Sequence, residues 1–249
     1  MKTVLLTGAT SGIGKATAIA LAKKKYKLIL CGRNQSILDE LKATLSTKIH
    51  ICCFDVRDKK EVFTHIESLP EEFRQIDVLI NNAGNAYGLA TFDQADLADL
   101  EAMIDINVKG LIYVTKAVLP LMPQGNESHI VNISSVAGKE VYLNGATYCA
   151  SKFAVEALTK GMRIDLQPLG IKVTGIAPGA VETNFSLVRF KGDSQKASQA
   201  YTGYQPLTAE DVSSTILFAI EQPNHVQIAD ITIFPKAQAS AANILKKQI

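Results

Sequence analysis

Short apolar runs recur along the chain, separated by longer stretches in which apolar residues return every three to four positions. The runs are typical of buried strands. The stretches between them, for example 15–24, 35–45 and 59–68, are typical of amphipathic helices. We therefore predict seven strands, near residues 3–6, 27–31, 50–54, 78–80, 129–133, 172–177 and 231–234.

Apolar strands that alternate with helices predict a parallel sheet covered on both faces. Because crossover connections are short and right-handed, a doubly wound sheet of the Rossmann type is favoured. The 249 residues contain no internal repeat, low-complexity segment or interdomain linker. We therefore expect a single α/β domain over residues 1–249, built on a doubly wound, seven-stranded parallel sheet with helices on both faces.

One stretch, residues 181–207, interrupts the alternation. It has no clean strand pattern and carries Gly192, Gly203 and Pro206 among several charges. Loops this long inside a compact domain are often lids or binding loops. We predict a substrate-binding loop at about 181–207, with a surface excursion of no function as the alternative.

Composition narrows the class of partner. The net charge is +2 and the charges are interspersed, which argues against nucleic acid or a membrane surface, since both usually need a concentrated basic patch. No run of eighteen apolar residues occurs, and the first apolar segment, Val4 to Leu6, is predicted to be a core strand and not a leader. We expect a cytoplasmic protein that acts on a small molecule.

Cysteine and histidine give no sign of a metal. Cys31, Cys52, Cys53 and Cys149 form no C-x-x-C pair, and the four histidines are scattered without metal-ligand spacing. We expect reduced thiols and no metal site.

The first predicted strand ends in a glycine-rich turn, Thr7 to Gly14. Its spacing is G-x-x-x-G-x-G, with a helix expected to start near Gly12. Glycines let the backbone approach a ligand closely, and a helix start offers free N–H groups to a phosphate. The turn therefore predicts a phosphate site, and a glycine turn without a ligand is the alternative.

Two further motifs follow predicted strands. Asn81-Asn82-Ala83-Gly84 ends the fourth strand, where small residues fit a wall beside a flat cofactor. Pro178-Gly179 ends the sixth strand. Open α/β sheets bind ligands at the carboxyl ends of their strands, so both motifs are expected to lie at one site.

Tyr148 and Lys152 carry the strongest chemical signal. A spacing of four places the phenol and the ammonium on one face of a helix. A nearby cation favours the phenolate and lowers the tyrosine pKa, and a phenol tuned in this way can exchange a proton with an alcohol or a carbonyl. Surface Tyr–Lys pairs share this spacing, so the pair gains its weight from the motifs around it.

The chain resembles the short-chain dehydrogenase/reductase superfamily from Lys2 to about Phe234, in the order and spacing of Thr7-Gly-x-x-x-Gly-x-Gly14, Asn82-Ala-Gly84, Asn107, Ser135, Tyr148-x-x-x-Lys152 and Pro178-Gly179. The resemblance implies a catalytic tetrad. Tyr148 would exchange a proton with the substrate while hydride passes to or from a nicotinamide, and Ser135 would hold the reacting oxygen. Lys152 would hold the nicotinamide ribose and keep Tyr148 acidic. Asn107 would support a water that links Lys152 to solvent; an asparagine that bonds locally within its helix is the alternative.

The end of the second predicted strand bears on the choice of cofactor. NAD-specific sites place an acid there for the ribose hydroxyls, but this chain has Gly32. Arg33 instead offers a planar cation suited to a 2′-phosphate, which predicts NADP(H), although an arginine simply solvated at a strand end is also consistent. Lys15 is expected to be a solvated helix residue. With the contacts that the resemblance implies, the expected cofactor set is Gly8, Thr10, Ser11, Gly12, Ile13, Gly14, Arg33, Asn34, Asp55, Val56, Asn82, Ala83, Gly84, Tyr148, Lys152, Pro178, Gly179, Val181 and Thr183.

Residues 185–193, with Asp55-Val-Arg57-Asp58 and Gly110-Leu-Ile-Tyr113, are similar to the NADP-dependent 3-hydroxy acid dehydrogenase subgroup. That similarity implies oxidation of L-serine, L-allo-threonine or 3-hydroxypropionate at the C3 hydroxyl, or reduction of malonic semialdehyde. Ser135 and Tyr148 would contact the substrate. A small acid also needs a cation for its carboxylate, which Arg189 or Lys191 could supply. Both could equally form surface or intersubunit salt bridges.

Other functions remain open on the same fold. A reductase of other ketones or aldehydes would use the same chemistry, and a panel of 3-hydroxy acids against neutral carbonyls would separate the two. A non-catalytic NADP(H)-sensing protein is disfavoured because all four tetrad residues are present, and a sugar-nucleotide epimerase because the chain is short.

The stretch from Tyr148 to Gln167 is predicted to be a helix with a stripe of small and apolar residues. Packing against the sheet explains part of it, and relatives use this helix in a four-helix interface, so we expect a homotetramer. The stripe consists of Ala150, Phe153, Ala154, Ala157, Leu158 and Gly161.

Overall fold

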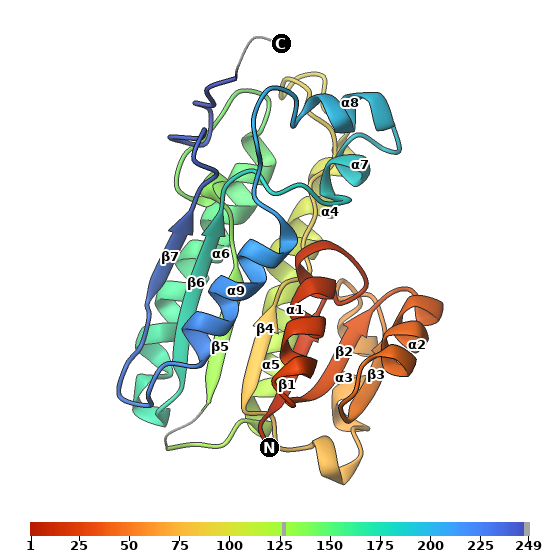
Figure 1. Ribbon diagram of the computed structural model, residues 1–249, viewed down its shortest axis with the longest axis vertical. Coiled ribbons are helices and arrows are strands. Elements are labelled where there is room, and N and C mark those ends of the chain that lie inside the picture. Colours follow the sequence, from red (N-terminus) through yellow and green to blue (C-terminus); the bar gives the residue numbers. More distant parts are fainter. Residues whose placement is uncertain (126–127, 247–249) are drawn as a thin grey trace.

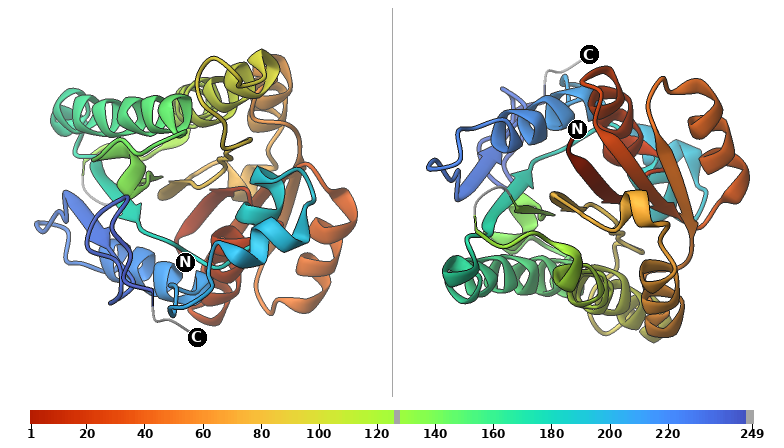
Figure 2. Two further views of the ribbon diagram at one scale, coloured as in Figure 1. Left: turned by 90° about the horizontal axis from the view of Figure 1, so that it is seen from above. Right: turned by 90° about the horizontal axis from the view of Figure 1, so that it is seen from below.

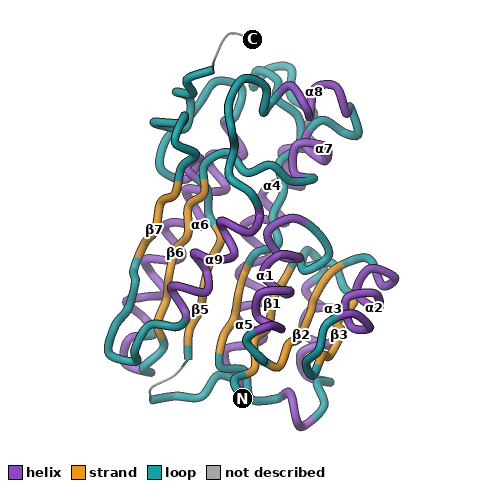
Figure 3. Tube along the Cα trace, viewed as in Figure 1, coloured by secondary structure: helices purple, strands orange, loops and turns teal. Residues whose placement is uncertain are grey.

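The computed structural model describes residues 1–125 and 128–246, in which strands and helices alternate along the chain (Figures 1 and 3). The strands are β1 (Thr3–Thr7), β2 (Lys27–Gly32), β3 (Ile49–Cys53), β4 (Val78–Asn81), β5 (His129–Ile133), β6 (Lys172–Pro178) and β7 (Asp230–Ile233). The helices are α1 (Gly12–Lys23), α2 (Gln35–Thr44), α3 (Lys59–Glu67), α4 (Leu97–Ile104), α5 (Leu111–Val118), α6 (Ala146–Asp165), α7 (Phe185–Arg189), α8 (Ser194–Gln199) and α9 (Ala209–Ile220).

The strands form one sheet in the order β3-β2-β1-β4-β5-β6-β7, and all neighbours are parallel. The predicted doubly wound seven-stranded sheet is therefore confirmed. The chain starts in the middle of the sheet, runs outward to β3 and then crosses back to β4. This reversal between β1 and β4 opens a crevice at their carboxyl ends, the place where such sheets bind ligands.

Helices cover both faces of the sheet, as the two end views in Figure 2 show. The alternation along β1 explains this arrangement: Val4 and Leu6 face the layer of α1, α2 and α9, whereas Leu5 faces the layer of α3, α5 and α6. All three side chains are fully buried. Successive strand residues point to opposite faces, so one apolar run supplies both cores.

The segment 181–207 contains no strand, as expected, but it includes the short helices α7 and α8. It lies above the carboxyl ends of the strands (Figure 1). Its two ends meet in a parallel bridge between Val181 and Leu207, with a hydrogen bond of 2.9 Å from Leu207 N to the Ala180 carbonyl. The segment is therefore a closed excursion over the sheet edge.

Within residues 1–125 and 128–246, no helix is long and apolar enough to span a membrane, and no three His, Cys, Asp or Glu side chains are grouped for a metal. All four cysteines are free thiols.

Candidate active site

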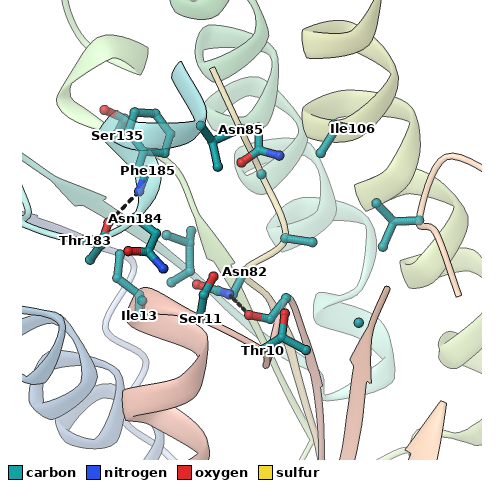
Figure 4. Close-up of a pocket in the computed structure, with 18 of the residues that line it drawn as sticks. Thr10, Ser11, Ile13, Asn82, Asn85, Ile106, Ser135, Thr183, Asn184 and Phe185 are labelled. Carbon is teal, nitrogen blue, oxygen red and sulfur yellow. Dashed lines mark hydrogen bonds between the residues drawn. The ribbon is translucent and has the colours of Figure 1, made fainter. Parts of the chain in front are cut away.

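A cleft lies at the carboxyl ends of β1, β2, β4, β5 and β6, and Figure 4 shows part of its lining. Most residues predicted from the sequence line it: Gly8, Thr10, Ser11, Gly12, Ile13, Arg33, Asp55, Val56, Asn82, Ala83, Gly84, Ser135, Tyr148, Lys152, Pro178, Gly179, Val181 and Thr183. Residues outside the predicted contact set line it as well: Cys31, Gly32, Phe54, Asn85, Ile106, Ile133, Ser134, Asn184, Phe185 and Val188. Gly14, Asn34, Asn107 and Arg189 lie outside the lining.

The glycine turn at the end of β1 brings the backbone into the cleft. Gly8 has φ 68° and Gly12 has φ 49°, a conformation that side chains other than hydrogen disfavour. Gly14 is needed for packing, because a Cβ there would lie 2.1 Å from the Gly8 carbonyl oxygen. Ser11 precedes α1 without a side-chain cap, which leaves the first N–H groups of the helix able to hold a phosphate.

Asn82 supports this turn from β4. Its side-chain amide donates to the Thr7 carbonyl at 2.9 Å and to the Gly8 carbonyl at 3.2 Å, and the Thr7 hydroxyl accepts from the Asn82 and Ala83 N–H groups. The sequence suggested only a wall for a cofactor. The structure shows in addition that Asn82 fixes the Thr7 and Gly8 carbonyls and so holds the conformation of the turn.

The β2–β3 end of the cleft (Arg33, Asp55 and Arg57) carries exposed charges. Arg57 forms a bidentate pair with Asp55, with Nη2 2.7 Å from Oδ2, whereas Arg33 Nη1 is 3.7 Å from the same oxygen. Burial would raise the pKa of Asp55, but the hydrogen bonds from Arg57 and the charges of both arginines hold it below its ordinary value. Arg33 therefore lines the cleft while Arg57 carries most of the pairing with Asp55.

Gly32 and Asn34 contribute to this end in different ways. A Cβ on Gly32 would lie 2.8 Å from Thr10 Cγ2, so glycine lets β2 approach the turn after β1. Asn34 was expected to contact the cofactor, but its side chain caps α2 by accepting from Ile37 N at 3.1 Å.

The catalytic end of the cleft (Ser135, Tyr148 and Lys152) is formed by β5, the turn after it and α6. Tyr148 and Lys152 lie in the first two turns of α6 and are 7% and 5% exposed. Lys152 Nζ donates to the Ile133 carbonyl at 3.0 Å and lies 5.9 Å from the centre of the Tyr148 ring. The predicted juxtaposition of phenol and ammonium on one helix face is therefore present.

The direction of the Tyr148 pKa differs from the sequence-based expectation. Burial raises its pKa well above the ordinary value, and the neighbouring Tyr142 adds to this. A hydrogen bond with Ser135 and the charge of Arg189 act in the opposite direction without outweighing burial. The expectation of a lowered Tyr148 pKa was wrong, because spacing along a helix does not reveal how deeply the phenol is buried.

Burial also acts on Lys152 and lowers its pKa to about 8, while the charge of Glu156 acts in the opposite direction. The phenol and the ammonium thus each lean toward their neutral forms at the catalytic end. Whether Lys152 carries its charge therefore depends on the ionised groups around it, such as Glu156.

Asn107 lies in a single π-helical turn, Asp105–Gly110, between α4 and α5. It is 2% exposed, accepts from Asn85 N at 2.9 Å and donates to the Asn85 carbonyl and the Ser151 hydroxyl. A Cβ on Gly84 would lie 3.0 Å from Asn107 Oδ1 and 3.3 Å from Lys152 Nζ. Asn107 therefore holds the loop after β4 against α6 beside Lys152.

The two candidate anchors for a substrate carboxylate differ. The Arg189 guanidinium carbon lies 5.3 Å from the Tyr148 ring centre, and its nitrogens donate to the Tyr142 hydroxyl and the Gly88 carbonyl. Lys191 points elsewhere and pairs with Asp99 at 2.8 Å. Of the two cations, only Arg189 lies beside Tyr148.

Two hydrogen bonds shape the rim of the cleft, one made by Gln238, which sequence reasoning overlooked, and one by Thr183, which was expected to contact the cofactor. Gln238, only 6% exposed, accepts from Ala180 N at 2.8 Å and fixes the loop after β6, where a Cβ on Gly179 would lie 2.4 Å from its Oε1. Thr183 accepts from Phe185 N at 3.2 Å and orients the start of α7 (Figure 4). Gln238 lies 58 residues from its partner, so no local pattern could reveal it.

Comparison with known proteins gives consistent matches over the whole chain. The family model for short chain dehydrogenase matches residues 2–192. An NADP-dependent 3-hydroxy acid dehydrogenase of Schizosaccharomyces pombe is 43% identical, over 99% of this chain and 97% of the relative. Sulfoacetaldehyde reductase 2 of Chromohalobacter salexigens is 44% identical, over 96% of each. The closed form of a serine dehydrogenase complexed with NADP⁺ is 41% identical with a TM-score of 0.93, over 99% of this chain and 100% of that one.

Proposed function

The chain belongs to the short-chain dehydrogenase family, and on that premise we propose that it transfers hydride between NADP and the C3 hydroxyl of small 3-hydroxy acids. The proposed substrates are of the L-serine, L-allo-threonine and 3-hydroxypropionate or malonic semialdehyde type. The names of the relatives support this substrate class.

The cleft fits NADP(H). The glycine turn and the uncapped start of α1 would hold the pyrophosphate, and Arg33 would meet the 2′-phosphate. The nicotinamide, when bound, supplies the acceptor or donor of hydride. Pro178, Gly179 and Thr183 line the same cleft as Tyr148.

We propose Tyr148 as the group that exchanges the substrate proton. In oxidation the C3–H bond breaks, its electron pair leaves as hydride, and the hydroxyl proton passes to the phenolate form of Tyr148, which becomes the neutral phenol. In reduction the same oxygen gives that proton to the carbonyl. The raised pKa keeps Tyr148 protonated, which suits a proton donor, while Ser135 orients the reacting oxygen.

The position of Arg189 is the observation that best supports an acidic substrate. Its guanidinium lies against the Tyr148 ring. Of its five N–H groups, one on Nε donates to the Gly88 carbonyl and one on Nη2 donates to the Tyr142 hydroxyl. A planar cation in this position can bind a carboxylate within a few bonds of the reacting carbon. Lys191 is the weaker candidate because it is paired with Asp99.

A second candidate function is the reduction of sulfoacetaldehyde or other short aldehydes and ketones. It is favoured by the 44% identity with a sulfoacetaldehyde reductase. A sulfonate presents the same anionic oxygens to Arg189 as a carboxylate, so the site alone supports both. A non-catalytic NADP(H)-sensing role is disfavoured because Ser135, Tyr148 and Lys152 converge in one cleft with Asn107 beside them.

The test is nicotinamide absorbance with NADP⁺ or NAD⁺ and L-serine or 3-hydroxypropionate, and with NADPH and sulfoacetaldehyde or neutral ketones. We expect turnover with NADP⁺ that falls at least a thousandfold in Tyr148→Phe, which keeps the ring but loses the proton. NADPH binding without turnover of any 3-hydroxy acid would exclude the proposed substrates. Turnover of sulfoacetaldehyde alone would select the second function.

We also propose a cytoplasmic homotetramer. Ala150, Phe153 and Ala157 of the α6 stripe are exposed in the single chain, and Phe153 is 42% exposed. An apolar helix face of this kind is typical of a subunit interface. Light scattering that gives a mass near the single-chain 26.9 kDa would contradict the tetramer.

A further inference from the structure

A second buried charge lies one helical turn beyond Lys152. Glu156 is 4% exposed and Lys152 is 5% exposed, and residues four apart share one face of a helix. Burying a carboxylate is costly unless it is paired, and an apolar residue of similar size would usually pack as well. The presence of Glu156 at this position therefore points to an electrostatic task.

Glu156 is held by a chain of ion pairs. Its Oε2 accepts from Lys139 Nζ at 2.6 Å, and the same Nζ donates to both carboxylate oxygens of Asp230 at 2.8 and 2.9 Å. Lys139 follows the short turn Val136–Gly138 after Ser135, and Asp230 begins β7. The ion pairs thus connect the catalytic turn, the catalytic helix and the edge of the sheet.

The other carboxylate oxygen of Glu156 has no such partner. Oε1 is buried and lacks a hydrogen-bond partner among the residues that the structure describes, and so does the hydroxyl of Ser134. Gly138 packs between them: a Cβ there would lie 2.7 Å from the Lys152 carbonyl, 2.8 Å from Ser134 Oγ and 3.0 Å from Glu156 Cγ. The turn carrying Ser135 therefore docks directly onto the part of α6 that carries Lys152 and Glu156.

Few charges act on Lys152. On α6, Tyr148 lies on one side and Glu156 on the other, and Glu156 is the acid whose charge supports the ammonium. β5 contributes the neutral Ile133 carbonyl, and the neighbouring loop and π-helical turn contribute Gly84 and Asn107, also neutral. Beyond these, Arg189 faces the Tyr148 ring, and Lys139 and Asp230 act through Glu156.

We propose that Glu156 is a positioning residue for the reaction: its carboxylate, held by Lys139 and Asp230, keeps the buried Lys152 protonated beside Tyr148. The inference rests on the roles proposed above for Tyr148 and Lys152. It explains why a carboxylate lies in a dry position one turn from the catalytic lysine, and why a salt-bridged lysine directly follows the catalytic turn.

The test is the pH profile of kcat between pH 6 and 10 for Glu156→Gln at saturating NADP⁺ and substrate. Without the negative charge, Lys152 should lose its proton at lower pH than in the wild type, because the influence that opposes burial is gone. We expect the alkaline limb to move down by about one pH unit, which is about a tenfold loss at pH 8.5, with kcat at pH 6 within about twofold of wild type.

Two variants control the experiment. Asp165→Asn removes the same charge from an exposed position at the end of α6 and should leave the profile unchanged. Glu156→Asp keeps the charge but places it one methylene further from Lys152. It should move the alkaline limb of the profile in the same direction as Glu156→Gln, but by less. It also serves as the test if Glu156→Gln does not fold.

Two outcomes overturn the proposal. One is a profile of the folded Glu156 variants that superimposes on wild type. The other is a loss of kcat that is equal at all pH values, which would mean a purely structural role. Retention of activity in Tyr148→Phe would instead refute the proposed function, so the two failures are distinguishable.

Discussion

At the β2–β3 end of the cleft the two arginine side chains are exposed to water, whereas at the catalytic end the charged side chains are buried. The side chains of Arg33, Arg57 and Asp55 are 55%, 43% and 23% exposed. Lys152 and Glu156 are nearly inaccessible. Exposed ion pairs contribute about 0–1 kcal/mol and are screened by salt, while buried charges shift pKa values by whole units. Recognition at one end should therefore depend on salt, and chemistry at the other on pH.

The largest difference is expected for Lys152→Met, which tests the buried end. It should lower kcat at least a thousandfold, because the ammonium beside Tyr148 is lost, and yet it should raise the thermal midpoint at pH 7. Burial lowers the pKa of Lys152, so its charged form costs the folded state free energy at pH 7, and an uncharged side chain of similar length should remove about 1–3 kcal/mol of that cost. Initial rates and thermal unfolding measure the two effects.

The same variant predicts a pH dependence of stability. The pKa of Lys152 is lowered to about 8 from 10.5, so as pH rises through 8 the folded chain releases this proton before the unfolded chain does. The free energy of unfolding of the wild type should accordingly gain a rising contribution between pH 8 and 10.5. Denaturation curves of Lys152→Met should lack that contribution, and an identical slope in both proteins would contradict it.

An intermediate effect is expected at the rim of the buried end, with Arg189→Ala. Loss of a charge-assisted contact worth about 1.5–3 kcal/mol should raise KM for 3-hydroxy acids roughly 10- to 150-fold, with KM for a neutral aldehyde little changed. Lys191→Ala is the matched control, because that side chain is paired with Asp99 and should leave both values unchanged. Equal losses for acids and neutral aldehydes would mean that Arg189 only holds α7 in place.

The smallest effect is expected at the exposed end, with Arg33→Ala. Arg33 is half exposed and lies 3.7 Å from an acid, so the NADP-over-NAD preference in kcat/KM should fall by about tenfold at low salt. The loss should shrink above about 0.15 M salt, where exposed charges are screened. Lys15→Ala, an exposed neighbour of the glycine turn paired with Glu40 at 3.9 Å, should have no effect. A loss of NADP preference that does not depend on salt would contradict the proposed difference between the two ends of the cleft.

The sequence predicted the sheet closely because each strand is a local apolar run. The run near 172–177 is observed as β6, Lys172–Pro178, and the three helices predicted over 15–24, 35–45 and 59–68 are α1, α2 and α3. The glycine turn and the Tyr148–Lys152 pair could be predicted for the same reason, because their geometry is set within a few residues.

The remaining features depend on contacts between distant residues. Asn82 reaches carbonyls 74 and 75 residues away, and Lys139 reaches Asp230 across 91 residues. The raised pKa of Tyr148 comes from burial by segments that no spacing rule connects to it. A sequence shows which side chains carry chemistry, whereas the dielectric environment that sets their strength follows only from the packed fold.

The bridge between Val181 and Leu207 has a consequence for how this protein changes over evolutionary time. Because the two ends of the segment are bridged to each other, a change in the length of the residues between them need not separate the end of β6 from the start of α9. Closing a longer loop costs only about 0.6 kcal/mol for each doubling of its length. Because Asn184, Phe185 and Val188 of this segment line the cleft, we expect changes in its length or sequence to alter the shape of the cleft while the sheet is retained.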